Sequence, residues 1–413
     1  MNHSSPTTVS LPSRRIASDL RELLDEFPAV VLLGPRQVGK TTLAKQCVDA
    51  MNSVQAGSAL YLDLELISGR RLIQDPESFF IAHHERLIVL DEVQRLPEIF
   101  ATLRGVIDQR RMMGESAGQF LLLGSASGVL LKQTSESLAG RVVKLQMTPW
   151  QLQELAASPT DIKIENALWL RGGYPKSYLA TSDAASRRWR DAAVASYLER
   201  DIPNLGLSMP ATLMERLFKM LAHNQGQMIN QSQLAGSLSI TGQAVTKCID
   251  VLVDLMLVRR LPPWSSNLGK RLVRSPKVYV RDSGLAHALL EITRFEELLA
   301  HPAVGQSWEG YCVEHLINAS LGMGRKAQAF FYRTSNGAEC DLVLEWTIGD
   351  VWVFEIKRSS APTVSRGFYE AAKDLKATRK ILVAPVDMCY SMKESIEVMP
   401  LLEAVRAVQS RAA

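Results

Sequence analysis

The sequence predicts an α/β protein with several domains, in which a parallel sheet with flanking helices comes first. The chain has 413 residues, which is too long for one ordinary hydrophobic core, since domains usually contain roughly 100 to 200 residues. Short apolar runs with helical stretches between them fill its N-terminal part. Because these runs are continuously apolar rather than alternating, they indicate strands covered on both faces, as in a parallel sheet.

The composition is that of a folded protein, with 46% hydrophobic and 22% charged residues. No apolar run approaches the roughly 18 residues that can cross a bilayer. Residues 1–15 lack the apolar core of a secretory signal and are expected to be a loose tail. The five cysteines are far apart and lack paired spacing, which argues against disulfides or a zinc site and favours a cytoplasmic protein. The net charge of +4 is too small to indicate nucleic-acid binding by itself.

The first motif lies between the first apolar run and a helix. Residues 29–48 contain a short strand, a Gly-rich turn and a helical pattern, and within them the turn satisfies GxxxxGK[ST]. The glycines let backbone amides turn toward phosphate, the lysine reaches the β and γ oxygens, and the threonine hydroxyl can ligate Mg²⁺. Because both flanking elements are present, a chance Gly-rich turn is disfavoured. The sequence predicts that ATP and Mg²⁺ bind at Gly34, Pro35, Arg36, Gln37, Val38, Gly39, Lys40, Thr41 and Thr42.

Two adjacent carboxylates, Asp91 and Glu92, follow the apolar run at residues 87–90. Ligands of parallel sheets bind at the carboxyl ends of the strands. Asp91 is therefore predicted to hold the metal through water, and Glu92 to orient and deprotonate the attacking water. The alternative, in which the two acids only cap a helix after a buried strand, is weakened by the phosphate loop that precedes them.

Two further positions keep more than one interpretation. Ser125, at the end of the run at residues 119–124, is predicted either to sense the γ-phosphate or to cap the following helix. Arg141 is predicted to reach a phosphate in its own subunit or across an oligomer interface, or else to be an ordinary surface charge. An arginine supplied across an interface would make hydrolysis depend on assembly, so a homo-oligomer is expected.

These segments resemble the AAA+-type P-loop ATPases of bacteria and archaea that carry a C-terminal domain of long-unassigned function. The resemblance rests on "GPRQVGKTTLAK", "VLDEVQRLPE" and "LLLGSAS", and it continues through "GGYPKSYLA", "YLERDI" and "KVYVRDSGLAHALL" over nearly the whole chain. The resemblance implies that the chain is an ATPase. That family often has Thr where this chain has Leu123, which weakens a sensor role for this position and leaves Ser125.

The middle of the chain, at residues 231–264, predicts a winged helix-turn-helix. A short helix, a turn, a second helix and a strand follow one another there. In a reader of double-stranded DNA, the second helix would present Gln243, Thr246 and Lys247 to the major groove. Four basic residues would lie near phosphates: Arg259, Arg260, Lys270 and Arg271. The alternative is an interdomain strut, because the second helix has one lysine on its early exposed face.

Asp341, Glu355 and Lys357 form the pattern D-x13-E-x-K on a predicted β-hairpin. Glu355 and Lys357 share a face because side chains alternate along a strand. Asp341 joins them only in one register, which a three-residue loop at residues 347–349 would give by pairing Asp341 with Glu355. A loop of two or four residues would place Asp341 on the other face.

This pattern resembles the restriction-endonuclease-like fold, in which a glutamate on a helix often completes the site. Glu309 matches that glutamate best, and Glu314 is the other option, although it points about 140° away around a helix. In that fold, carboxylates would share a second Mg²⁺ or a Mn²⁺, while Lys357 would balance charge on the scissile phosphate. The alternative is an inactive domain used for binding, in which Lys357, Arg358 and Arg366 attract phosphate without cutting.

The sequence thus predicts Mg²⁺-dependent ATP binding and hydrolysis coupled to nucleic-acid binding or to metal-dependent DNA processing. The alternative is a nucleotide-switched binding or signalling protein with an inactive nuclease-like domain. The predicted parts are a tail, a P-loop ATPase domain, a helical and winged-helix region, and an α/β restriction-endonuclease-like domain, at residues 1–15, 16–155, 156–275 and 276–413, respectively.

Overall fold

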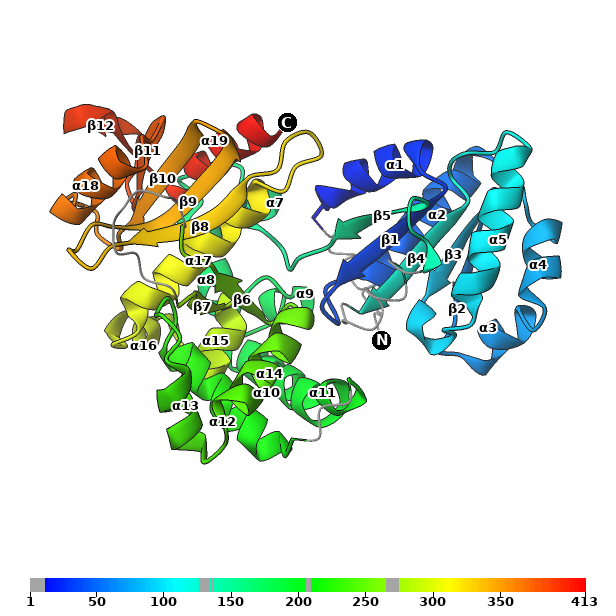
Figure 1. The fold of residues 1–413 in the computed structure, drawn as a ribbon, viewed down its shortest axis with the longest axis horizontal. Coiled ribbons are helices and arrows are strands. Elements are labelled where there is room, and N and C mark those ends of the chain that lie inside the picture. The colour runs from blue at the N-terminus through cyan, green and yellow to red at the C-terminus, as the bar shows by residue number, and fades with distance from the viewer. Residues whose placement is uncertain (1–11, 126–133, 135–136, 206–208, 265–274) are drawn as a thin grey trace, which may run out of the picture.

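A computed structural model describes residues 12–125, 134, 137–205, 209–264 and 275–413. An α/β domain with a parallel sheet forms the N-terminal part, and a helical region and a mixed sheet follow it (Figure 1). Among the described residues, no helix combines the length and the apolar character that crossing a bilayer requires.

The N-terminal sheet has five parallel strands in the order β2-β3-β4-β1-β5. Separate hydrophobic clusters involve alternate residues of the central strands, so both faces of the sheet are covered, as predicted. The strands are β1 (Ala29–Gly34), β2 (Ala59–Asp63), β3 (Leu87–Asp91), β4 (Phe120–Ser125) and β5 (Val142–Gln146). The helices are α1 (Ile16–Glu26), α2 (Lys40–Val54), α3 (Ile67–Leu72), α4 (Pro76–Ala82), η1 (Val93–Arg95) and α5 (Ile99–Met112).

The middle region is mainly helical and contains a two-stranded antiparallel sheet. Its first part contains α7 (Leu152–Leu155), α8 (Ile162–Arg171), α9 (Pro175–Tyr178), α10 (Asp183–Ser196), a π-helical turn η2 (Tyr197–Asp201) and α11 (Ile202–Asn204). Its second part contains α12 (Ala211–His223), α13 (Gln231–Leu238), α14 (Gly242–Asp254), β6 (Val258–Leu261), β7 (Lys277–Val280), α15 (Ser283–Leu289) and α16 (Phe295–Ala300).

The winged-helix elements lie where the sequence predicts them. The turn between α13 and α14 contains Ser239 in the left-handed conformation, with φ 55°, and the Thr241 hydroxyl accepts a hydrogen bond from the Ala244 amide to cap α14. Lys270 and Arg271 lie outside the described residues. Because β6 and β7 pair across the boundary predicted after residue 275, that boundary is wrong: it divides one small sheet.

The C-terminal sheet has six strands in the order β12-β13-β11-β10-β9-β8 and is mixed. Strands β10, β11 and β13 run parallel, while β8, β9 and β12 are antiparallel to their neighbours. The elements are α17 (Val304–Ala319), β8 (Gln328–Arg333), β9 (Glu339–Thr347), β10 (Asp350–Ile356), α18 (Arg366–Asp374), β11 (Arg379–Val383), β12 (Tyr390–Met392), η3 (Lys393–Ser395), β13 (Ile396–Met399) and α19 (Leu401–Ala412).

The register between β9 and β10 is the one that the D-x13-E-x-K pattern requires, but it arises differently. The turn has two residues, Ile348 and Gly349, rather than three, because Thr347 pairs with Asp350. A bulge at Trp346 then shifts the register by one, so that Phe354 faces Leu342. One residue further, Asp341 lies opposite Glu355. The predicted loop length is therefore wrong, and the bulge restores the pairing.

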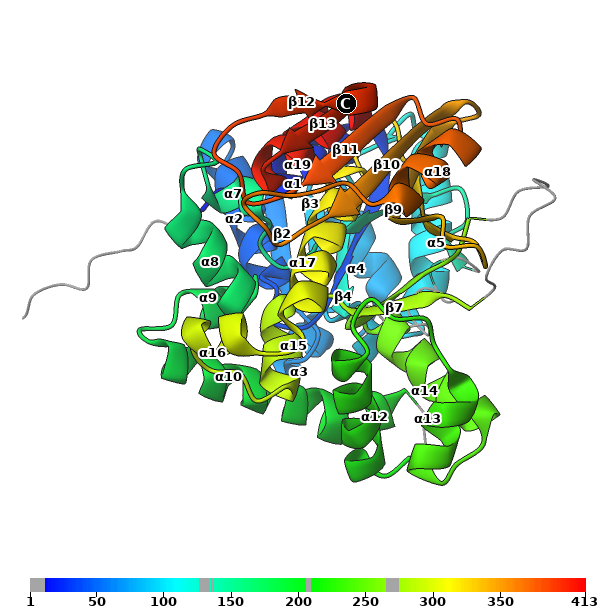
Figure 2. The same cartoon turned by 90° about the vertical axis from the view of Figure 1, so that its left-hand side faces the viewer.

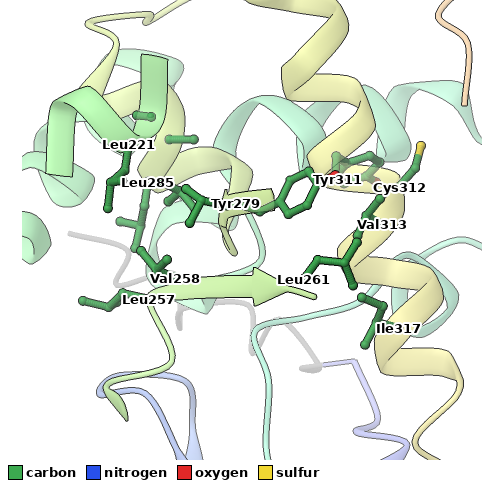
Figure 3. Close-up of a cluster of buried hydrophobic side chains, with 14 of the residues drawn as sticks. Leu221, Leu257, Val258, Leu261, Tyr279, Leu285, Tyr311, Cys312, Val313 and Ile317 are labelled. Atoms are coloured by element: carbon green, nitrogen blue, oxygen red, sulfur yellow. The ribbon is translucent and has the colours of Figure 1, made fainter. Parts of the chain in front are cut away.

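One hydrophobic core runs through the middle region and one face of the C-terminal sheet. Helix α17 is its centre, since α17 contacts both α15 and strands β9 and β10 (Figure 2). Figure 3 shows part of this core, where apolar side chains of α12, the β6 and β7 pair, α15 and α17 gather. The residues labelled there are Leu221, Leu257, Val258, Leu261, Tyr279, Leu285, Tyr311, Cys312, Val313 and Ile317.

Candidate nucleotide-binding site and C-terminal acidic cluster

The loop between β1 and α2 has the backbone of a phosphate-binding turn. Gln37 and Gly39 have positive φ angles of 61° and 103°, so the chain reverses sharply before α2 begins at Lys40. A Cβ atom on Gly34 would lie 2.4 Å from the Met147 carbonyl oxygen, so no side chain fits there without movement of the backbone. The loop amides thus lie at the N-terminus of α2, where anions bind favourably.

Lys40 lies inside this loop rather than on the surface. Its side chain is buried, and its Nζ donates to the carbonyl oxygens of Gly34 and Pro35, both at 2.9 Å. Burial lowers the pKa of Lys40 to about 8, against the opposing effect of the nearby carboxylates of Glu92 and Asp91. Both acceptors of these hydrogen bonds are neutral carbonyl oxygens. They do not neutralise the Lys40 ammonium, so its charge can attract an anionic ligand.

Asp91 accepts hydrogen bonds from neutral donors. Its Oδ2 accepts from the Thr41 hydroxyl and the Tyr61 hydroxyl, each at 2.7 Å, and its Oδ1 accepts from the Glu92 amide at 2.9 Å. The Thr41 and Asp91 oxygens therefore lie side by side, as the sequence predicts for a Mg²⁺ site. Mg²⁺ prefers such oxygens and usually keeps several waters and phosphate ligands, so the residues present fit this ion. Tyr61 was not predicted, because only the pairing of β2 with β3 brings it to Asp91.

Glu92 and Ser125 belong to one hydrogen-bond network at the carboxyl ends of β3 and β4. The Gln94 side-chain amide donates to Glu92 Oε2 and to Ser125 Oγ, the latter at 3.3 Å. Glu92 itself has a left-handed backbone, with φ 54°, which turns the chain away from the strand. Gln94 was not predicted, although "DEVQ" places it directly after the acidic pair.

A cleft of about 970 Å³ lies between the phosphate loop and the helices of the middle region. Its floor contains Gly39, Lys40, Thr41, Thr42 and Glu92, and its other side contains Trp150, Leu179, Trp189 and Arg200. Contacts join the two sides of the cleft: the Tyr197 hydroxyl donates to the Arg36 carbonyl oxygen at 3.3 Å, and the Arg36 guanidinium lies 2.9 Å from Asp201. The middle region therefore directly contacts the phosphate loop.

Arg141 does not reach this cleft within its own subunit. It precedes β5, whose first residue pairs with Ala29 at the amino end of β1, whereas the phosphate loop follows the carboxyl end of β1. Its guanidinium makes a two-point ion pair with Asp108, with both distances at 2.7 Å. The expectation that Arg141 contacts phosphate in its own subunit is therefore wrong, and a role across an oligomer interface stays a prediction.

The C-terminal acids converge, but around a lysine that was not predicted. Lys277 Nζ lies 3.0 Å from Glu309 and 3.7 Å from both Asp341 and Glu339. The Tyr279 hydroxyl also donates to Glu309, at 2.7 Å. Lys277 was missed because it belongs to β7, outside the predicted nuclease pattern.

This lysine changes the electrostatics of the cluster. Burial alone would lower the pKa of Lys277, but the carboxylates of Glu309, Asp341 and Glu339 outweigh it and raise the pKa above its ordinary value. Burial and the neighbouring Asp341 raise the pKa of Glu309 to about 7. Glu355 has a separate partner, since Lys357 Nζ lies 2.9 Å from it. Within the described ranges, no three His, Cys, Asp or Glu side chains are arranged to hold a metal ion, so the predicted second Mg²⁺ or Mn²⁺ is not supported.

Several other predicted contact residues have partners within the protein. Glu314, the alternative nuclease glutamate, is buried between Arg259 and Arg281, at 2.6 and 2.7 Å. Arg259 therefore does not face a phosphate, and Arg260 is bound to Asp250. On α14, Gln243 and Lys247 are exposed, but Thr246 is half-buried and bonds to Gln231 and to the Gly242 carbonyl group. In the C-terminal domain, Arg358 stacks on Trp169 and Trp308, and exposed Arg366 pairs with Glu370.

Three family models match successive parts of the chain. Residues 26–156 match an AAA domain, residues 163–296 a domain of unknown function (DUF8612) and residues 304–404 a second domain of unknown function (DUF4143). The chain is 38% identical to uncharacterized proteins of Mycobacterium tuberculosis and Mycobacterium bovis, over 97% of this chain and 87% of each relative.

Similar solved structures include a Walker-type ATPase of Pyrococcus abyssi, with 15% identity and a TM-score of 0.43, covering 68% of this chain and 97% of that one. They also include the Orc1 protein of Aeropyrum pernix in complex with DNA, with 14% identity and a TM-score of 0.30, covering 68% and 93%.

Proposed function

The chain belongs to the same family as its mycobacterial relatives and carries an AAA domain, and from this premise we propose that it is a Mg²⁺-dependent ATPase. The observation that carries the proposal is the 2.7 Å contact between the Thr41 hydroxyl and the Asp91 carboxylate, directly beside a buried Lys40. A phosphate loop alone would bind many anions. The Thr41 and Asp91 oxygens beside it favour ATP, because they are suited to the Mg²⁺ ion that accompanies ATP.

The residues of the cleft divide the chemistry between them. The loop amides and Lys40 bind the β- and γ-phosphates, while Thr41 and Asp91 would hold Mg²⁺. When bound, this ion supplies positive charge that neutralises the phosphate oxygens. Glu92 orients a water molecule and accepts its proton. The water oxygen forms a bond to the γ-phosphorus, and the bond to the β–γ bridging oxygen breaks, leaving its electron pair on ADP.

The test is phosphate release by the purified chain with ATP, in the presence of Mg²⁺ or of EDTA, together with Glu92→Gln. We expect Glu92→Gln to bind a fluorescent ATP analogue like the wild type but to lose at least roughly 100-fold in kcat, because the amide cannot accept the proton. No release by the wild type, or normal release in EDTA, contradicts the proposal. Normal turnover by Glu92→Gln would remove this residue from the role of base.

For the C-terminal domain, the position of Lys277 favours binding over cutting, so the nucleotide-switched binding protein is our second proposal. An ammonium group among Glu309, Asp341 and Glu339 supplies the positive charge that a nuclease site would take from a metal. Double-stranded DNA is a candidate partner, since Gln243 and Lys247 are exposed on α14.

A cleavage assay distinguishes a DNA-binding domain from a nuclease. The purified chain is incubated with plasmid or linear DNA in Mg²⁺ or Mn²⁺, with and without ATP. We expect no cleavage by the wild type. Cleavage that disappears in both Asp341→Ala and Lys357→Ala would instead establish the metal-dependent nuclease.

A further inference from the structure

The nucleotide cleft contains an arginine that the middle region supplies. Arg200 lines this cleft together with Lys40, Thr41 and Glu92, and its Nη2 lies 3.2 Å from Glu65 Oε1. We propose that Arg200 stabilises the charge that develops on the γ-phosphate during hydrolysis, and that Glu65 holds Arg200 aside until ATP binds. This inference rests on the ATPase function proposed above and concerns the regulation of the same site.

Arg200 belongs to the π-helical turn η2, which contacts the N-terminal domain. Successive residues of an α-helix point about 100° apart, yet Arg200 and Asp201 both contact that domain, at Glu65 and Arg36. The Tyr197 hydroxyl, at the start of the same turn, donates to the Arg36 carbonyl oxygen. Turns of this rare type are frequently found at functional sites. Here the turn presents two neighbouring side chains to the N-terminal domain, and one of them, Arg200, lines the cleft.

These two ion pairs differ in solvent exposure. The side chains of Arg36 and Asp201 are 22% and 10% exposed, whereas those of Arg200 and Glu65 are 50% and 48% exposed. A half-exposed pair contributes little net stability, since water solvates both partners well when they separate. The Arg36–Asp201 pair thus keeps the turn beside the phosphate loop, while Arg200 can exchange Glu65 for a phosphate oxygen. In this exchange the guanidinium donates hydrogen bonds and transfers no proton.

Glu65 also offers a matched control. The same Oε1 atom lies 3.3 Å from Arg95, so two arginines share one carboxylate oxygen. Their side chains are similarly exposed, at 43% and 50%. Of these two described residues, only Arg200 lines the cleft. Substituting either arginine removes one ion pair from Glu65, but only Arg200 is placed to reach ATP.

The experiment measures kcat and KM by phosphate release, and binding of a fluorescent ATP analogue, for the full chain and for Arg200→Ala, Arg200→Lys and Arg95→Ala. We expect Arg200→Ala to lower kcat by at least roughly tenfold, since arginines in this role contribute large factors to phosphoryl transfer. Analogue binding by Arg200→Ala should stay within about threefold of the wild type, because the group acts in the transition state. Arg200→Lys should fall between Arg200→Ala and the wild type, because an ammonium keeps the charge but lacks the fork of donors.

Arg95→Ala should keep kcat within about twofold of the wild type, since exposed ion pairs have small effects. Equal kcat values for Arg200→Ala and Arg95→Ala, or wild-type kcat in both Arg200 variants, overturn the inference while the ATPase function stands. A wild type that binds the analogue but releases no phosphate overturns the ATPase function and the inference with it. Near-ultraviolet circular dichroism of each variant verifies the fold, and Arg200→Lys gives the result if Arg200→Ala does not fold.

Discussion

The nucleotide site and the C-terminal acidic cluster contain the same residue types, but their acids have different partners. In the nucleotide site, Asp91 accepts from the hydroxyls of Thr41 and Tyr61, while Lys40 donates to backbone carbonyl groups. In the C-terminal cluster, Lys277 lies directly among Glu309, Asp341 and Glu339. Neutral donors leave the charge of a carboxylate uncompensated, whereas an ammonium group compensates it.

A lysine near acidic side chains can therefore have either of two opposite roles, as the pKa values of Lys40 and Lys277 indicate. Lys40 is buried at an energetic cost, which is reflected in its lowered pKa, and we propose that its charge serves a ligand. Lys277 is stabilised in its charged form by the carboxylates around it and serves the fold. The two lysines can therefore be compared by the same substitution, with affinity for ATP and free energy of unfolding as the two measurements.

The largest expected effect is on ATP affinity in Lys40→Met. The substitution removes charged hydrogen bonds to phosphate, each worth about 1.5 to 3 kcal/mol, so affinity should fall roughly 100-fold or more. The free energy of unfolding should hardly fall, because the substitution removes a buried charge that is hydrogen-bonded to carbonyl oxygens rather than to a carboxylate. Titration with a fluorescent ATP analogue and chemical unfolding measure the two quantities. Wild-type affinity in this variant would remove Lys40 from the binding site.

The same substitution at Lys277 should act in the opposite way. Lys277→Met leaves Glu309 and Asp341 buried without their cation, and breaking a buried ion pair typically costs about 3 to 5 kcal/mol of stability. ATP affinity should stay within about twofold of the wild type, because Lys277 is not among the described residues that line the nucleotide cleft. As a control, adding Glu309→Gln to Lys277→Met should restore part of the lost stability. An unchanged free energy of unfolding would contradict the role assigned to Lys277.

Two buried histidines, His287 on α15 and His315 on α17, should each lower the free energy of unfolding in acid. The raised pKa values of Glu165, Asp282 and Glu309 act in the opposite direction, so the histidine contribution is measured as a difference between variants. Burial lowers the pKa of His287 to about 3 and that of His315 to about 4, while an unfolded histidine titrates near 6.5. Between those values the unfolded state binds protons at these two histidines that the folded state does not, so their contribution to stability falls as the pH falls below about 6.5. At pH 5 each histidine should cost about 2 kcal/mol.

The measurement is the free energy of unfolding from pH 7 to pH 5, followed by tryptophan fluorescence. Five of the seven tryptophans belong to the hydrophobic core that includes residues of α15 and α17, or pack against it: Trp169, Trp189, Trp308, Trp346 and Trp352. Between pH 7 and pH 5, His315→Gln should lack the loss of about 2 kcal/mol that His315 contributes in the wild type. A slope that is unchanged by this substitution would show that His315 titrates normally in the folded protein.

The sequence predicted local patterns better than contacts between distant segments. The phosphate loop is one continuous stretch, and the helix that follows it fixes its shape, so Gly34 to Thr42 fold as expected. Tyr61, Lys277 and Arg200 were missed because strand pairing and domain packing bring them to their places. Arg141 was misplaced because sequence order does not state at which end of the sheet a residue lies; the pairing of β5 with β1 does.

The hairpin at β9 and β10 shows how a correct register can follow from a wrong loop. A two-residue turn by itself would have placed Asp341 on the face away from Glu355 and Lys357. The bulge at Trp346 reverses that shift, and bulges carry no simple sequence signal. From the sequence, Asp341 could lie on the same face as Glu355 or on the opposite face, and nothing in the hairpin decided between them. The hairpin also gave no sign of the Lys277 ammonium group among the acids.

The smallest expected effect is the change in Tm that a divalent metal causes without nucleotide. This measurement distinguishes the nucleotide site from the C-terminal acidic cluster most directly. Thr41 and Asp91 provide only two oxygens, and Mg²⁺ is usually held by few carboxylates together with phosphates and water. Mg²⁺ alone should therefore shift the Tm by less than about 1 °C, and Mg²⁺ with ATP should shift it by several degrees, since a ligand at about 100 times its Kd adds about 2.7 kcal/mol. Mn²⁺ alone should also have almost no effect, because Lys277 supplies the cation of the C-terminal cluster. A shift of several degrees with Mn²⁺ alone that Asp341→Asn abolishes would show that the metal displaces the ammonium group, and would restore the nuclease hypothesis.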